Sequence, residues 1–297
     1  MDARFSAASR GASFGSLTQG QTMRFEELSY ASPDQPWIKR QVIRSIERFS
    51  NRQHLEDLYE IWQETIVGRS DRIMTELLGL LDVDMKVTAR EWPPRNLPDG
   101  PLVIIANHPF GIGDGIAILS IAEALDRPFK ILINKDLLKV PEIRSYSLPV
   151  DFDETREALE TNLRTKREAI RLLKEGYTIV IFPAGGVATA KKPFGKAEDL
   201  PWKLFPARLI QQSKATVLPV YFQGQNSWIF HLASQISETL RLSLLVREFS
   251  RFAGSIVPVH IGDMIPYDDF AQIRDRKMLT DYLYDRVFGM DPAGATA

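Results

Sequence analysis

Apolar residues in this chain form short unbroken runs, which alternate with longer stretches of helical spacing. We interpret five runs as buried strands: Leu102–Ala106, Phe129–Ile133, Thr178–Phe182, Thr216–Phe222 and Ile256–Ile261, to which Met85–Thr88 can be added. The stretches between them predict three helices: Ile116–Leu125, Asp153–Glu175 and Trp202–Ser213. Because apolar strands that alternate with helices are covered on both faces, we predict an α/β fold with a mixed, largely parallel sheet flanked by helices.

The N-terminal part of the chain has a different pattern. Helical spacing predicts three further helices: Trp37–Phe49, His54–Ile66 and Asp71–Leu81. Residues 1 to about 21 are rich in Ser, Gly and Ala and lack the apolar centre of a secretory signal. A proline-rich linker follows the third helix, from Trp92 to Gly100. We therefore predict a flexible tail at 1–28, an N-terminal helical extension at 29–91 and the α/β domain at 92–297.

Composition excludes several classes of function. The chain has 297 residues, of which 25% are charged, and its net charge of −1 does not argue for nucleic-acid binding. The absence of cysteine excludes disulfides, thiolate metal sites and a cysteine nucleophile. The four histidines lack the spacing of metal ligands, so we expect no metal site. No uncharged apolar stretch of about 18 residues is present, so we expect no membrane-spanning helix.

The candidate chemistry lies on the loop Asn107–Gly115, directly after the first of the five strands. Histidine titrates near neutral pH and can take a proton from a hydroxyl or amine, and a nearby carboxylate can fix its tautomer. On a continuous helix, His108 and Asp114 would be rotated by about 600° and would lie on different faces. They can meet if the segment turns, which Gly111 and Gly113 permit.

This loop resembles the glycerolipid and lysophospholipid acyltransferase family (PlsC-like). The five residues between its His and Asp resemble the hemolysin-like and ornithine-lipid acyltransferase branch in particular. Three further blocks follow in the family's order: Asn134–Pro141, Ile181–Val187 and Val217–Phe222. The resemblance extends from roughly residue 29 to residue 270.

The resemblance implies transfer of a long-chain fatty acyl group from acyl carrier protein or coenzyme A to the hydroxyl or amine of a lysophospholipid or lyso-aminolipid. His108 would be the general base and Asp114 its support, with turn amides of the loop near the oxyanion. The thioester is a co-substrate, so no cofactor is expected. The residues expected to contact the substrates are Asn107, Gly111, Gly113, Lys135, Phe182, Pro183, Gly185, Gly186 and Pro219.

The third block departs from the family's pattern. Ala184 and Gly186 stand where an acidic residue would be, and the arginine that commonly follows is absent. Lys191 and Lys192 come instead and either contact a phosphate or are simply solvated, and the same two readings apply to Lys135. Two alternative functions therefore stay open: a thioesterase or lipase in which His108 activates water, and a lipid-binding pseudoenzyme.

Two stretches, Trp37–Arg52 and Trp228–Phe252, combine apolar and basic residues. Such helices either lie in the interface of anionic lipid or pack an apolar stripe on the sheet and leave a solvated basic face. Their basic faces could also dock the acidic acyl carrier protein. We expect a bacterial enzyme of lipid metabolism that is cytoplasmic and peripheral on the inner face of the cell membrane.

Overall fold

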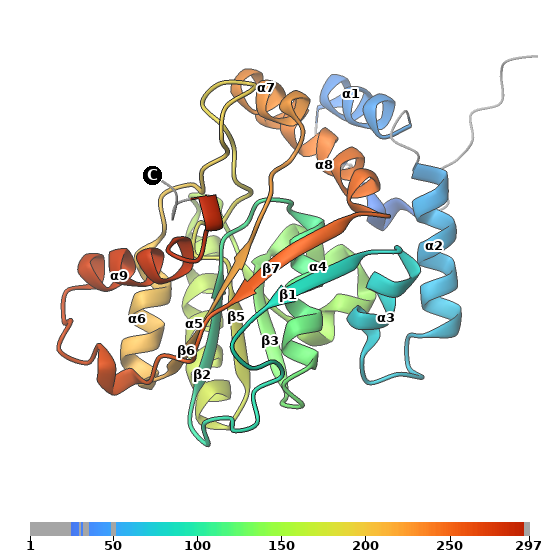
Figure 1. Cartoon of the computed structure of the whole chain (residues 1–297). Coiled ribbons are helices and arrows are strands. Elements are labelled where there is room, and N and C mark those ends of the chain that lie inside the picture. Colours follow the sequence, from blue (N-terminus) through green and yellow to red (C-terminus); the bar gives the residue numbers. More distant parts are fainter. Residues whose placement is uncertain (1–24, 30, 32–35, 49–51, 294–297) are drawn as a thin grey trace, which may run out of the picture.

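The computed structural model describes residues 25–29, 31, 36–48 and 52–293 (Figure 1). Residues 1–24 of the predicted tail lie outside the described residues. The last residues of that segment are packed: Glu26–Leu28 form a 3₁₀ turn, and the Phe25 ring lies edge-on to Tyr59 at 5.0 Å. Residues 25–28 are therefore packed, although we predicted them to be part of a flexible tail.

A seven-stranded sheet has the order β1-β7-β6-β2-β5-β3-β4. Its strands are β1 (Asp84–Thr88), β2 (Leu102–Ala106), β3 (Phe129–Asn134), β4 (Ser147–Val150), β5 (Thr178–Ile181), β6 (Thr216–Phe222) and β7 (Ile256–Ile261). The pairing of β6 with β7 is antiparallel, and the other neighbours run parallel. The predicted α/β fold is confirmed. Because β1 pairs with β7, the sheet begins before residue 92, where we placed the domain boundary.

Helices cover both faces of the sheet (Figure 1). They are α1 (Trp37–Arg48), α2 (Arg52–Thr65), α3 (Ile73–Leu80), α4 (Ile112–Glu123), α5 (Arg156–Lys174), α6 (Leu204–Ser213), α7 (Trp228–Ile236), α8 (Glu238–Phe252) and α9 (Arg276–Phe288). All five residues of β2 are buried, and they alternate between the two faces. Leu102 and Ile104 pack with α2, α3 and α4, whereas Val103 and Ile105 pack with α5, α6 and α9.

Three helical assignments differ from the sequence prediction. Helix α4 begins at Ile112, four residues earlier than predicted. The prediction began too late because the first residues of the helix are rich in glycine, a poor helix former. Helix α9 was not predicted, although its buried residues Leu279, Leu283 and Val287 follow helical spacing. The stretch Trp228–Phe252 is interrupted at Ser237 and forms α7 and α8.

Helix α8 packs against α1 and α7 at one end of the molecule. Its apolar residues Leu244, Leu245, Val246 and Phe252 are buried, so they belong to the core and not to a membrane-facing surface. Of the two readings left open for Trp228–Phe252, the packed apolar stripe is therefore the one that holds for α8. Within the described part of the chain, no helix combines the length and the apolar character needed to cross a bilayer.

Candidate active site

The loop between β2 and α4 brings His108 and Asp114 together. Gly111 stands at the N-cap of α4 with φ of +81°, a left-handed conformation that favours glycine. This turn places His108 Nδ1 at 2.9 Å from Asp114 Oδ1. The two side chains therefore meet at the carboxyl end of β2, as the glycine-rich loop predicts.

Gly113 has a different role from the one predicted. It lies within α4 and does not form the turn. A Cβ atom at this position would come within 2.5 Å of the Phe252 ring. The lack of a side chain at Gly113 thus lets α8 pack closely against the start of α4.

Asp114 is fully buried and fixes the state of the imidazole. Its Oδ2 accepts a hydrogen bond of 2.7 Å from the Phe110 amide, while its Oδ1 faces His108. Because a carboxylate oxygen accepts hydrogen bonds, the neutral imidazole of His108 donates from Nδ1 to Asp114 and keeps its lone pair on Nε2. Burial lowers the pKa of His108, but the charge of Asp114 and its hydrogen bond together outweigh this effect and raise the pKa above that of an ordinary histidine.

The segment after β5, which contains the third block, packs on this histidine. The Phe182 ring stacks on the imidazole with 4.0 Å between centroids and 19° between planes. Gly185, with φ of +70°, donates its amide to the Phe182 carbonyl, and Ala188 donates to the His108 carbonyl at 2.7 Å. The block therefore supplies a ring and main-chain contacts that hold the plane and position of the imidazole.

Asp199 is a residue of this site that sequence reasoning missed. One carboxylate oxygen accepts a hydrogen bond of 3.1 Å from the His108 amide, and the other accepts one of 2.9 Å from Trp202 Nε1. Burial raises the pKa of Asp199, and the negative charge of Asp199 contributes to the raised pKa of His108. The sequence holds no motif around Asp199 that would have indicated it.

Arg241 is a second residue that the sequence did not indicate. It extends from α8 and donates through Nη2 to the Val187 carbonyl at 2.6 Å. A Cβ atom on Gly186 would lie 3.8 Å from the same nitrogen. Burial lowers the pKa of Arg241, and its positive charge lowers the pKa of His108. The third block, which lacks an acid and an arginine in sequence, thus lies beside Asp199 and Arg241.

Lys135 is engaged elsewhere. Its ammonium contacts Asp151 at 2.8 Å and Asp153 at 2.6 Å, beside the ends of β3 and β4. These hydrogen bonds raise the pKa of Lys135 above its ordinary value. The contacts of Lys135 in the structure are therefore those of an ion-pair cluster two strands away from β2.

Three other predicted residues have structural contacts. The Asn107 side chain donates to the Phe222 carbonyl and accepts from the Phe222 amide, which fastens β2 to β6. Pro219 lies inside β6, where a Cβ atom on Gly262 would come within 2.8 Å of its ring. The Pro183 carbonyl accepts from the Lys203 amide at 2.9 Å.

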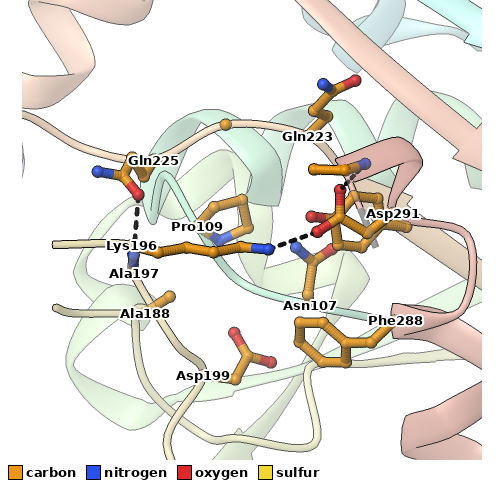
Figure 2. Close-up of a pocket in the computed structure, with 13 residues that line it drawn as sticks. Asn107, Pro109, Ala188, Lys196, Ala197, Asp199, Gln223, Gln225, Phe288 and Asp291 are labelled. Carbon is orange, nitrogen blue, oxygen red and sulfur yellow. Dashed lines mark hydrogen bonds and ion pairs between the residues drawn. The ribbon is translucent and has the colours of Figure 1, made fainter. Parts of the chain in front are cut away.

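A cavity of about 180 Å³, lined by both polar and apolar residues, borders the loop at Asn107 and Pro109 and reaches Asp199. Figure 2 shows Lys196 extending across it to Asp291, with 2.7 Å between the charged atoms. This ion pair joins the loop after β5 to the segment that follows α9. The cavity therefore combines groups of both charges close to the main chain of His108.

A buried carboxylate paired with a histidine, at the carboxyl ends of parallel strands, defines an α/β enzyme site suited to proton transfer. A family model described as Acyltransferase matches residues 86–223, which contain the His108–Asp114 loop, Phe182 and all of β6. These matched residues and the relatives described below support the lipid acyltransferase family, and the chain is an acyltransferase enzyme.

Curated bacterial relatives agree with this family. A lyso-glycine lipid O-acyltransferase of Bacteroides thetaiotaomicron is 25% identical over 224 residues, which cover 71% of this chain and 76% of the relative. A protein of the same name from Phocaeicola vulgatus is 22% identical over 223 residues, which cover 71% and 75% of the two chains. Among solved structures, the 1-acyl-sn-glycerophosphate acyltransferase PlsC of Thermotoga maritima aligns with a TM-score of 0.49 and 17% identity, over 84% of this chain and 93% of that one.

Proposed function

We propose that this enzyme transfers a long-chain acyl group from acyl carrier protein or coenzyme A to a hydroxyl of a lysolipid. The observation that carries this proposal is the His108–Asp114 pair, in which Nδ1 is held by the carboxylate and Nε2 has the free lone pair. Nε2 takes the proton of the acceptor hydroxyl as the oxygen attacks the thioester carbonyl. The C–S bond then breaks, and the imidazolium returns the proton to the departing thiolate.

Asp114 stabilises the imidazolium that forms during this step. The first N–H groups of a helix have no partner within it, and the start of α4 lies four residues after the base. We assign these amides to the oxyanion of the tetrahedral intermediate. The charge that develops on this oxygen is favoured by the positive end of the α4 dipole.

A lyso-aminolipid is the acceptor that we favour. The spacing of His108 and Asp114 resembles that of the hemolysin-like and ornithine-lipid acyltransferase branch. This acceptor is supported by the curated relatives, both named lyso-glycine lipid O-acyltransferases, whose names also favour a hydroxyl over an amine. The cavity beside Asp199 is lined in part by Lys196, Gln223 and Gln225, which offer hydrogen-bonding partners for a small head group.

The position of the enzyme in the cell is part of the same proposal. We place it at the inner face of the cytoplasmic membrane as a peripheral protein, because both the acceptor and the product are lipids. We also propose that residues 29–91 form an N-terminal extension of the catalytic domain. Strand β1 lies within this segment but belongs to the sheet of the catalytic domain, where it pairs with β7.

The direct test combines the purified chain with an acyl thioester and lysolipid acceptors, followed by mass spectrometry of the lipids. We expect one acylated lipid for each thioester consumed, with a lyso-aminolipid as the preferred acceptor. Free fatty acid formed at the same rate without acceptor would instead identify a hydrolase. Absence of turnover with every acceptor, together with lipid binding, would identify a pseudoenzyme.

The charges around His108 predict opposite pH shifts for two variants. A general base works when unprotonated, so activity is expected to rise with pH through the pKa of His108, which is raised above that of an ordinary histidine. Asp199→Asn removes a negative charge, which should lower the pKa of His108 and move the rise in activity to lower pH. Arg241→Gln removes a positive charge and should move it to higher pH, each by about one unit or less. The measurement is kcat/KM against pH.

Asparagine matches aspartate in size, and glutamine keeps a polar but shorter side chain in place of arginine. A purely structural effect would lower the rate without moving the pH profiles of the two variants in opposite directions. If activity in both variants rises at the same pH as in the wild type, the charges of Asp199 and Arg241 do not shift the pKa of His108.

A further inference from the structure

The outer face of α7 exposes a row of large apolar side chains. Trp228, Leu232 and Ile236 are 47%, 37% and 66% exposed and lie four residues apart, so they share one side of the helix. Phe230 and Ala233, on the inner side, are buried. Helix α7 thus has apolar side chains on two sides, one packed against the protein and one exposed to solvent.

The loop after β5 extends this surface. Phe194 is 83% exposed, and its ring stacks on Trp228 with 5.2 Å between centroids. We define these four side chains, Phe194, Trp228, Leu232 and Ile236, as the α7 patch. A contiguous exposed apolar surface of this kind marks a binding surface more often than does a single exposed residue.

The α7 patch is held on a fixed support. The Ser227 hydroxyl caps α7 and also donates to Glu248 of α8 at 2.6 Å. From the other side, the Gln235 side chain donates to the Ala190 carbonyl at 3.2 Å. The loop after β5 and α7 therefore present their apolar side chains together, and Figure 1 shows α7 at the end of the molecule where α1 and α8 also lie.

Basic residues flank the apolar side chains. Lys191 and Lys192 precede Phe194 and are exposed, and Lys191 also contacts Glu198 at 3.1 Å. Lysine is depleted in protein–protein interfaces, and a stable interface of that type needs roughly 20–30 residues on each side. Aromatic side chains beside lysines instead suit the boundary of an anionic bilayer, where rings enter the head-group region and ammonium groups meet lipid phosphates.

We propose that the α7 patch is the surface by which this enzyme lies on an anionic lipid bilayer. The proposal rests on the proposed function, because it gives the lysolipid a route to the site. The loop that carries Phe194 also carries Phe182, which stacks on His108, and Asp199, which bonds to its main chain. A bilayer seated on the α7 patch thus adjoins the segment that forms one wall of the site.

The test measures sedimentation of the full chain with vesicles, either of phosphatidylcholine or of phosphatidylcholine with anionic phosphatidylglycerol. The variant Phe194→Ser/Trp228→Ser is expected to bind the anionic vesicles at least roughly tenfold more weakly than the wild type. The matched control is Leu159→Ser/Met278→Ser, which removes two side chains of 60% and 65% exposure from α5 and α9 and should bind normally. Lys191→Gln/Lys192→Gln should reduce the preference for anionic vesicles.

Activity separates this proposal from the proposed function. The patch variant should lose transfer to acceptor in vesicles and keep transfer to acceptor dispersed as monomers. Equal loss of vesicle binding in the patch variant and the control would overturn the proposal, as would a self-association that needs the patch while vesicles are not bound. A wild type that binds vesicles through the patch but transfers no acyl group would uphold the surface and refute the proposed activity.

Discussion

Replacing His108 with alanine is expected to lower kcat by roughly 10²- to 10⁴-fold, the range that general-base catalysis supplies. The imidazole is the group whose Nε2 lone pair is left available by the Asp114 contact, and alanine cannot take the proton of an acceptor hydroxyl. The measurement is steady-state acyl transfer, with the thioester and the acylated lipid both quantified.

The matched control is His54→Ala, which removes an exposed histidine from α2. The control should keep full activity, and both variants should unfold at temperatures close to that of the wild type. Undiminished transfer by the His108 variant would show that His108 is not the general base, and the proposed mechanism would be wrong.

Asp114→Asn is expected to reduce kcat by roughly 10³-fold or more, by analogy with carboxylate-to-amide changes behind a catalytic histidine. The amide oxygen can still accept the Phe110 amide, so its nitrogen faces the imidazole. Since an amide nitrogen donates, His108 Nδ1 would become the acceptor, and the proton would move to Nε2. The nitrogen needed to take the acceptor's proton would then be blocked.

Nitrogen-15 spectra of the imidazole test the tautomer separately from the rate. The wild type should carry its proton on Nδ1 above the pKa of His108, and the variant should carry it on Nε2. Asp263→Asn, a change at an exposed carboxylate, is the control for the loss of charge. A slow variant that keeps the wild-type tautomer would mean that Asp114 acts by charge alone.

The sequence predicted those parts of the site that lie within one short segment. His108, Asp114 and the turn at Gly111 are within seven residues, so local backbone geometry determines whether they meet. The start of α4 was placed too late because glycine is an unfavourable residue in a helix, and tertiary packing of Gly113 against Phe252 overrides that preference. Strand β4, a four-residue strand at the edge of the sheet, gave too little pattern to be recognised.

The residues that sequence reasoning missed reach the site from far along the chain. Asp199 lies 91 positions from His108, and its place depends on how the loop after β5 folds back over the end of β2. Arg241 looks like one basic residue of a surface helix until α8 is packed against α1, α4 and α7. In the same way, the apolar residues of α7 and α8 look alike in sequence, and packing alone buries those of α8.

The sequence by itself determined the alternation of strands and helices, the buried character of β2 and the histidine–carboxylate loop that follows it. These features follow from side-chain periodicity and from the conformational freedom of glycine, which act over a few residues. The tertiary structure decided the environment of that loop: the ring that stacks on the imidazole, the opposite charges of Asp199 and Arg241, and the exposed face of α7. These depend on contacts between segments that only the packed sheet brings together, because burial and electrostatic interaction are set by distance in space.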